Sequence, residues 1–306
     1  MTISSWDLEI DNGWGHFPSL SSATIGTGPH VLTNPLAVNY PLNAFVVAFP
    51  NSSRCWRANL GVLDRKINRA VILAAGDGNR MGELTRNRPK VLLPMNNKEE
   101  PLILSPIKAL AAVGIRNIAI VVGYLANEIR HKLEDGSQYG VSLRYVENPD
   151  YLGGNAISAW KAKSWAAGEP VILCMGDHII DTNIVRNLLS TAEINDTLCV
   201  EYRPTLNHKI EEATKVAVFE DGSIRDIGKQ LRHWDALDSG VFLLTDRFFN
   251  AVDALARLRG NSIEMSDVIR FMVARGHRFN TCDVSSCSWM DIDIEEDLRL
   301  AQSKGA

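Results

Sequence analysis

Short apolar runs alternate with segments of helical periodicity from residue 69 onward. Four of these runs have the length and the branched residues of buried strands: residues 70–75, 117–123, 142–147 and 170–176. Apolar residues recur with helical spacing in four other segments: residues 102–113, 126–133, 156–166 and 184–192. This alternation predicts an α/β fold with a doubly wound, mostly parallel sheet. Such sheets bind ligands at the carboxyl ends of their strands, so we expect the site in the loops that follow the strands.

The pattern changes beyond residue 196, where strand-like runs follow one another directly. Asp221 and Gly222 stand between two alternating runs, a sequence typical of a hairpin turn. We therefore predict a β-rich lid insertion in this part of the chain. The final elements predicted are two helices, one strand and a terminal helix, at residues 247–258, 265–275, 279–284 and from 294 onward.

Residues 1–66 differ from the rest because Gly, Ser, Asn and Pro recur and no regular period persists. We predict a poorly ordered N-terminal extension here and a folded domain over residues 67–306. The apolar run at 44–49 could add one strand, but so short a run does not separate strand from helix. The alternative is a mispredicted translation start, in which case truncation before Ile67 leaves activity intact.

Composition restricts the classes of partner. The 306-residue chain has a formal net charge of -4 and a pI near 6.0, which disfavours a nucleic-acid partner. Five cysteines without a CxxC pair argue against a disulfide framework and a zinc knuckle. No apolar run approaches the ~18 residues that span a bilayer, and Asp7 and Glu9 stand where a signal peptide carries cations. We expect a cytoplasmic protein with no membrane span.

The loop after the first predicted strand carries the first chemical signal. Its backbone at Ala75, Gly76 and Gly78 can approach a ligand closely, and consecutive amide groups can surround phosphate oxygens. Arg80 and Lys90 follow, and two cations beside bare amides suit a triphosphate. The loop lacks the third glycine of a dinucleotide fingerprint and the GK[ST] ending of a P-loop. The alternative for these residues is a tight turn with solvated charges.

Carboxylates at two places are candidate metal ligands. Asp177 ends a very apolar run, where it could hold a hard cation or, alternatively, cap the next turn. Asp291 and Asp293 precede acidic residues that suit the start of a helix. Mg²⁺ prefers one or two carboxylates together with substrate phosphates. We therefore predict Asp177 and Asp291 as Mg²⁺ ligands, with Asp293 as the adjacent candidate because it can share a strand face.

The glycine segment LAAGDGNRMGELTRNRPKVLLP resembles the signature LAAGxGxRLxPLTxxxPKxLxP of sugar-phosphate and related nucleotidyltransferases. This resemblance implies a Rossmann-like sheet of the nucleotidyltransferase type. It also implies that Gly76, Gly78 and Arg80 hold the nucleotide while Lys90 stabilises charge on the α-phosphate, so that Arg80 and Lys90 are catalytic. Members of the family carry GD and WxD motifs as metal ligands, which supports Asp177 and Asp291.

Residues 148–163 resemble the base-recognition loop of the cytidylyltransferases that act on inositol 1-phosphate, where the pattern is GNxxS. The resemblance implies that Asn155 and Ser158 contact the base of CTP. An asparagine can donate to and accept from a base edge, but Asn155 is an equally good helix N-cap.

Residues 211–244 resemble the ATKV, IGK and DTGVF segments of the same cytidylyltransferases, with Ser239 where threonine is more usual. The resemblance implies that Lys215, Lys229 and Asp238 bind the phosphorylated acceptor. The alternative is that the two lysines lie on the solvated face of a hairpin.

The implied reaction is Mg²⁺-dependent transfer of CMP from CTP to a phosphorylated small molecule such as inositol 1-phosphate, with release of pyrophosphate. Positioning and charge neutralisation suffice for such a transfer, so no protein base is expected and His178 is interpreted as a turn or pocket-wall residue. Enzymes for sugar 1-phosphates, phosphocholine or phosphonates are alternatives. A non-catalytic nucleotide-sensing module is the alternative of another class. Since no membrane span is expected, a separate CDP-alcohol transferase could act downstream.

Overall fold

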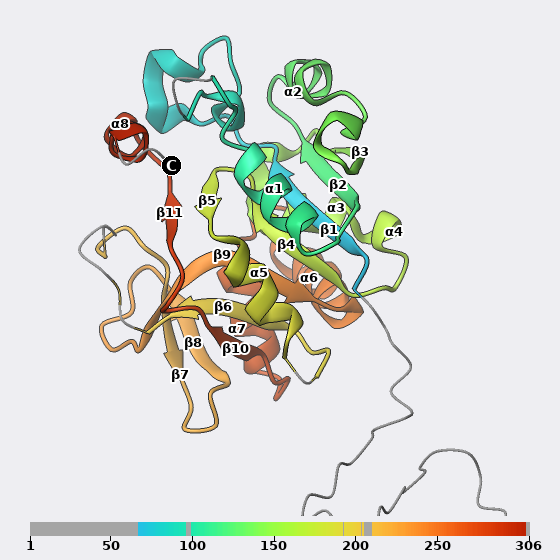
Figure 1. Cartoon of the computed structure of the whole chain (residues 1–306). Helices are drawn as coiled ribbons and strands as arrows, with labels where there is room; N and C mark the ends of the chain where they lie inside the picture. The colour runs from blue at the N-terminus through green and yellow to red at the C-terminus, as the bar shows by residue number, and fades with distance from the viewer. Residues whose placement is uncertain (1–66, 96–98, 192, 203, 205–209, 304–306) are drawn as a thin grey trace, which may run out of the picture. The chain divides into compact units, whose positions relative to one another are not determined.

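The computed structural model describes residues 67–306 apart from 96–98, 192, 203, 205–209 and 304–306 (Figure 1). The predicted N-terminal extension at 1–66 and the apolar run at 44–49 lie outside the described residues. Both therefore stay predictions, as does the boundary at residue 67.

A mostly parallel sheet organises the described chain (Figure 1). It comprises β1 (Arg69–Ala74), β2 (Asn117–Val122), β3 (Ser142–Glu147), β4 (Val171–Met175), β6 (Thr197–Glu201), β7 (Lys215–Val218), β8 (Ile224–Gly228), β9 (Ala236–Leu244) and β10 (Asn280–Asp283). The main order is β10-β6-β9-β4-β1-β2-β3. β1 is parallel to β2 and β4, β2 to β3, and β10 to β6, whereas β9 is antiparallel to β4 and β6. The predicted α/β fold is thus confirmed.

The described chain also contains an antiparallel hairpin and a separate two-stranded sheet. The predicted hairpin is present as β7 and β8, and β7 also pairs with β9 through Lys215 and Leu237. The β-rich insertion is therefore joined to the main sheet. A separate two-stranded sheet pairs β5 (His178–Ile180) with β11 (Trp289–Asp291), and its register sets Asp291 opposite His178.

The helices agree with the sequence expectations within a few residues. They are α1 (Leu104–Ala112), α2 (Ala126–Leu133), α3 (Asn155–Lys161), α4 (Lys163–Ala166), α5 (Thr182–Leu189), α6 (Asp246–Arg259), α7 (Met265–Val273) and α8 (Glu295–Ser303). Short 3-10 helices are η1 (Asn79–Thr85), η2 (Lys90–Leu92), η3 (Ser137–Tyr139) and η4 (Tyr151–Gly153). The segment predicted as one helix over 156–166 is divided at Ala162, where ψ is -3°. No described helix combines the length and apolar character that a membrane crossing requires.

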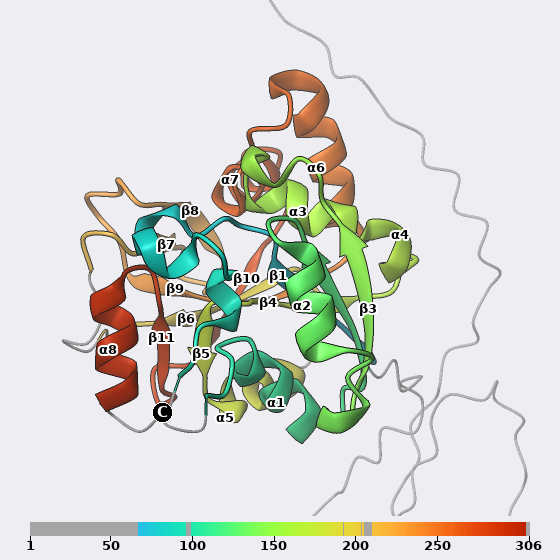
Figure 2. The same ribbon diagram turned by 90° about the horizontal axis from the view of Figure 1, so that it is seen from above.

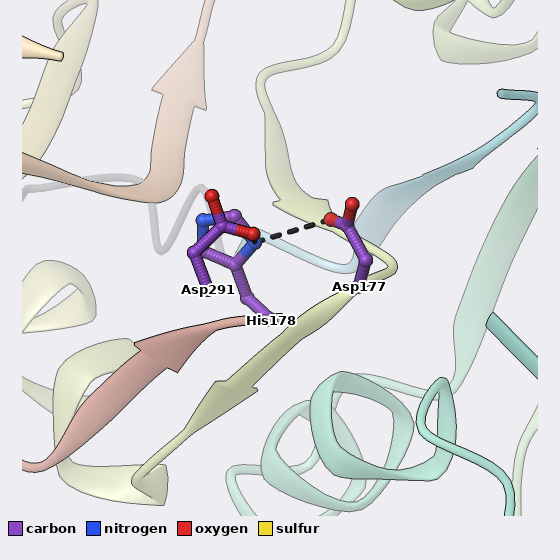
Figure 3. A group of neighbouring side chains, drawn as sticks. All are labelled: Asp177, His178 and Asp291. Carbon is purple, nitrogen blue, oxygen red and sulfur yellow. Dashed lines mark hydrogen bonds and ion pairs between the residues drawn. The ribbon is translucent and has the colours of Figure 1, made fainter. Parts of the chain in front are cut away.

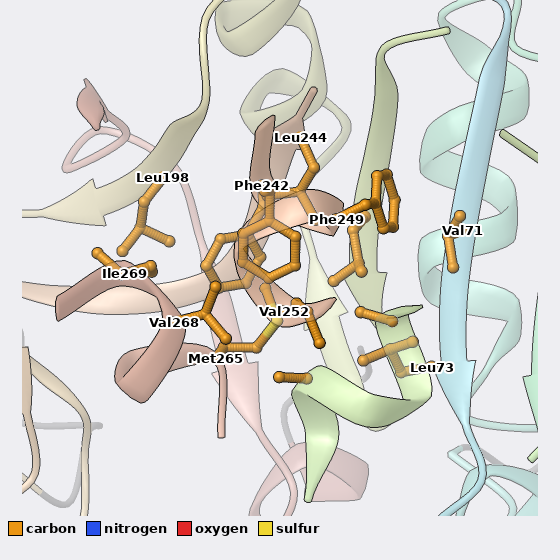
Figure 4. Packing of buried hydrophobic residues seen from close by; sticks show 14 of the residues in the cluster. Val71, Leu73, Leu198, Phe242, Leu244, Phe249, Val252, Met265, Val268 and Ile269 are labelled. Atoms are coloured by element: carbon orange, nitrogen blue, oxygen red, sulfur yellow. The ribbon is translucent and has the colours of Figure 1, made fainter. Parts of the chain in front are cut away.

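The two faces of the sheet are covered by different helices (Figure 2). Successive side chains of a strand point to opposite faces, so Val71 and Leu73 join one apolar cluster while Ala70 and Ile72 join another. The first cluster includes residues of α3, α6 and α7 around Phe242 (Figure 4), and the second includes residues of α1 and α5. Burial on both faces explains why these strands are continuous apolar runs.

Candidate active site

The glycine loop follows β1 and leads into η1. Gly78 has φ +64°, and a Cβ at this position would lie 2.8 Å from the Cβ of Lys90, so the site favours glycine. A Cβ at Gly76 would meet no atom within 4 Å. Gly76, Gly78, Arg80 and Lys90 are among the residues that line a hollow of about 290 Å³. Open space beside backbone amides is the arrangement that a phosphate chain requires.

Lys90 is the buried cation of this hollow. Its side chain is only 9% exposed, and its Nζ donates to Asp177 Oδ2 at 2.6 Å and to Asp293 Oδ1 at 3.1 Å. Burial alone lowers the pKa of Lys90, but the neighbouring carboxylates, led by Asp177, outweigh it and raise the pKa above its ordinary value. Burial acts to raise the pKa of Asp177, yet the charge of Lys90 holds that pKa well below its usual range. Both groups therefore stay charged at neutral pH.

Arg80 reaches one of these carboxylates, Asp293, from the loop. Its two terminal nitrogens donate to the two oxygens of Asp293 at 2.7 and 2.6 Å. Burial acts to raise the pKa of Asp293, but the charges of Lys90 and Arg80 lower it overall. The Arg80 side chain is 57% exposed, which leaves it accessible to a ligand while it is paired.

His178 lies between two of the predicted metal ligands (Figure 3). Its Nδ1 is 3.1 Å from Asp177 Oδ1 and 3.6 Å from Asp291 Oδ1. Burial lowers the pKa of His178, but the two carboxylates overcome this effect and raise it to about 9. Burial raises the pKa of Asp291 to about 6, although the nearby charge of His178 opposes the rise. The ring is the cationic partner of both carboxylates at neutral pH.

The chemistry of these residues fits a divalent metal ion. Donor atoms of Asp177, His178 and Asp291 all lie within 4.8 Å of one another. Among the described residues, the buried Asp291 Oδ1 is a side-chain oxygen with no hydrogen-bond partner. A buried acceptor without a hydrogen bond is costly, and a cation would satisfy it. Asp177 and Asp291 could therefore hold the metal. Lys90 occupies one oxygen of Asp177, whereas Arg80 occupies both oxygens of Asp293.

A second cavity, of about 640 Å³, adjoins the glycine-loop hollow. The predicted site residues among its lining are Arg80, Asn155, Asp177, Lys229, Asp238, Asp291 and Asp293. Three of them, Arg80, Asp177 and Asp293, also line the smaller hollow. The two spaces therefore meet at the carboxylate and cation cluster.

Asn155 and Asp238 line the larger cavity but already have backbone partners. Asn155 Oδ1 accepts a hydrogen bond from the Met265 N–H at 2.7 Å, which ties the start of α3 to the start of α7. Asp238 Oδ1 accepts from the Gly240 N–H at 2.8 Å. Burial raises the pKa of Asp238 to about 6, although the Gly240 hydrogen bond and the charge of His178 lower it.

Three other predicted site residues do not line either space. Ala75 is buried, and its carbonyl accepts from the Tyr124 N–H. The buried Ser158 hydroxyl accepts from the side-chain amide of Asn148 at 2.9 Å. Lys215 is buried, and its amine donates to the backbone carbonyls of Glu211 and Lys229, at 3.2 and 2.9 Å. Their predicted contacts with nucleotide or acceptor stay predictions.

Residues 69–304 match the nucleotidyl transferase family. The chain belongs to this family. It is 34% identical over 238 residues to the bifunctional IPC transferase and DIPP synthase of Rubrobacter xylanophilus, a match covering 76% of this chain and 51% of that protein. It is 29% identical over 247 residues to the CMP-5'-(3-aminopropyl)phosphonate synthase of Streptomyces rubellomurinus, covering 76% and 38%.

A solved structure, the inositol-1-phosphate CTP transferase from T. maritima, aligns with this nucleotidyltransferase at a TM-score of 0.68 and 26% identity. The alignment covers 77% of this chain and 95% of that one. The predicted family and fold are thereby confirmed. The chain spans about half or less of the length of the two curated relatives named above.

Two features of the nucleotidyltransferase site go beyond the sequence prediction. His178 was interpreted as a turn or pocket-wall residue and does line the larger cavity, but its contacts with Asp177 and Asp291 were not predicted. The available signal was the apolar pair that follows His178, which marks a second short strand after the Asp177 turn. The start of α7 also lines the larger cavity through Glu264 and Asp267. These two residues form a reciprocal capping box at the start of the helix. The signal in the sequence was one acidic residue three positions before another.

Proposed function

We propose that this nucleotidyltransferase transfers CMP from CTP to a phosphorylated small molecule such as inositol 1-phosphate, with Mg²⁺ bound and pyrophosphate released. The observation that carries the proposal is the common wall of the two cavities, formed by Arg80, Asp177 and Asp293. A triphosphate beside the glycine loop and an acceptor in the larger space would meet there. In-line transfer at phosphorus requires such a meeting point. The names of the relatives and of the structural neighbour support CTP and inositol 1-phosphate.

The groups of the chain that act on the nucleotide have different roles, which follow from their positions in the site. Loop amides at Gly76 and Gly78, together with the accessible guanidinium of Arg80, bind the phosphate chain. Lys90, which is buried and permanently charged, stabilises the negative charge that develops on the α-phosphate. Asp177 and Asp291 would hold a divalent ion, which would supply further positive charge near the phosphate oxygens. The acceptor's phosphate oxygen is already anionic, so it can attack without a protein base.

The larger cavity supports an acceptor with several hydroxyl groups. Its lining includes the carboxylates of Glu212, Asp238, Glu264 and Asp267 and the cation Lys229. Carboxylate oxygens accept hydrogen bonds from hydroxyl groups, while a lysine can pair with the acceptor's phosphate. The same carboxylates would attract an ammonium group, as in phosphocholine or an aminoalkyl phosphonate. The acceptor panel must therefore contain both classes.

A substrate panel with pyrophosphate detection tests the proposal. The protein is incubated with Mg²⁺, with CTP, UTP or dTTP, and with inositol 1-phosphate, glucose 1-phosphate, phosphocholine or 3-aminopropylphosphonate. We expect release with CTP and inositol 1-phosphate. Preferred release with UTP or dTTP and glucose 1-phosphate would contradict the substrate assignment. Nucleotide binding without release in any combination would favour the sensing module.

A matched pair of variants separates loss of the site from loss of the fold. Asp177→Asn keeps the shape but removes the charge of a metal ligand, so turnover should fall by about 100-fold or more. Asp181→Asn is the control, because Asp181 caps α5 through its side chain and asparagine caps equally well. An equal loss in both variants would refute the assigned role of Asp177.

A further inference from the structure

The metal cluster contains a nitrogen donor among its oxygens. His178 Nδ1 is 3.1 Å from Asp177 Oδ1 and 3.6 Å from Asp291 Oδ1. Bonds of about 2.1 Å around one ion place neighbouring donors about 3.0 Å apart and opposite donors about 4.2 Å apart. Both separations from Nδ1 fall in this range, and all three donors lie within 4.8 Å of one another, so they could share one metal ion.

The fold holds the imidazole ring of His178 in this position. The β5–β11 register sets Asp291 opposite His178, and directly opposed residues of antiparallel strands project to the same face. The ring stacks on Trp289 with an interplanar angle of 8° and a centroid distance of 6.2 Å. On its other edge, a Cβ at Gly240 would lie 2.6 Å from ring atoms, so glycine leaves just enough room. Packing thus fixes the orientation of the His178 ring, as is required of a side chain that binds a metal ion directly.

A second observation points to a ligand at the same place. Asp291 Oδ1 is buried and, among the described residues, has no hydrogen-bond partner. The Nδ1 of His178 is 3.6 Å away, which is longer than a hydrogen bond. An ion between these two atoms and Asp177 would satisfy the oxygen that the protein leaves unsatisfied.

We propose that His178 Nδ1 is a third metal ligand beside Asp177 and Asp291, so that the centre binds Co²⁺ more tightly than Mg²⁺. This proposal rests on the metal site of the proposed function and adds which metal ion that site prefers. Carboxylates and water suit Mg²⁺, whereas an imidazole nitrogen favours the later first-row transition metals. When the ion binds, Nδ1 donates its lone pair to the ion, and the proton that Nδ1 carried leaves to solvent.

Metal binding measured without nucleotide tests the ligand assignment. Mg²⁺, Mn²⁺ and Co²⁺ are titrated into the full chain by calorimetry, and pulsed electron paramagnetic resonance of bound Mn²⁺ detects a directly bound nitrogen. We expect nitrogen coupling in the unmodified protein. We expect His178→Phe, which keeps an aromatic ring against Trp289, to abolish the coupling and weaken Co²⁺ binding about tenfold or more. Mg²⁺ binding should weaken less.

Two further variants keep the outcome decisive. His131→Asn removes an exposed histidine of α2, so it should leave tight Co²⁺ binding and the nitrogen coupling unchanged. His178→Asn, whose amide oxygen can replace the donor, serves if the phenylalanine variant fails to fold, and should lose the Co²⁺ preference. A Mn²⁺ spectrum without nitrogen coupling in the unmodified protein, or unchanged Co²⁺ affinity in folded His178 variants, would overturn the proposal. Failure of the substrate panel would leave these binding results intact, so the two proposals can fail separately.

Discussion

Replacing Lys90 by methionine should destabilise the protein and make its stability more dependent on metal. The Lys90 side chain is 9% exposed and bridges Asp177 and Asp293 at 2.6 and 3.1 Å. Removing one partner of a buried ion pair leaves uncompensated charge and costs about 3–5 kcal/mol of unfolding free energy. A divalent ion that neutralises Asp177 would return part of this loss. Free metal at about 100 times its Kd stabilises the folded state by about 2.7 kcal/mol.

Urea unfolding with and without Mg²⁺ measures both effects. The control is Lys108→Met, because the Lys108–Glu100 pair at 2.7 Å is 54% and 37% exposed and such pairs contribute less than about 1 kcal/mol. We expect the gain from Mg²⁺ to be larger in Lys90→Met than in the control, and pyrophosphate release to be lost in Lys90→Met alone. Equal stability of the two variants without metal would refute the buried-pair reasoning. An equal gain from Mg²⁺ would refute the competition between Lys90 and the ion.

Four other substitutions have definite expectations. Gly240→Ala should cost about 2–5 kcal/mol in urea unfolding, since φ is +76° and the new Cβ lies 2.6 Å from the His178 ring. Gly260→Ala, with the same φ but no atom within 4 Å, should cost only about 1–2 kcal/mol. Phe242→Ala empties a fully buried position and should cost about 3–5 kcal/mol by the same measurement, and a smaller loss would contradict its central packing. Burial raises the pKa of Asp238 to about 6, so the folded state binds more protons than the unfolded state between pH 4 and 6. Stability should therefore fall as the pH rises through this range, and Asp238→Asn should flatten that part of the stability–pH curve.

The fold was predictable where local sequence reflects burial. Strands β1 and β4 are buried on both faces and so form apolar runs with clear ends. The place of β9 was not predictable, because its antiparallel pairing with β4 and β6 depends on distant segments rather than on its own pattern. The break at Ala162 also left no signal, since neither glycine nor proline interrupts the apolar spacing there.

The site was predictable where strand ends bring residues together. Lys90 and Asp177 follow neighbouring strands, so their contact at 2.6 Å agrees with the expected carboxyl edge. The contacts of Lys215 were not predictable from its own sequence pattern. Its residue type suits a phosphate, but the backbone just before β7 and just after β8 supplies the carbonyls of Glu211 and Lys229, to which its amine donates. Side-chain direction at such a position depends on the tertiary fold.

In the proposed site, the charges of the cluster would link the binding of metal and nucleotide. Lys90 and His178 already pair with carboxylates that would hold the ion. A divalent ion at Asp177 would take over the charge that Lys90 balances, so the amine would become available to a phosphate. A triphosphate that draws Lys90 away would leave Asp177 more negative and strengthen metal binding. Each ligand would therefore raise the affinity for the other, and thermodynamic linkage requires that the two factors be equal.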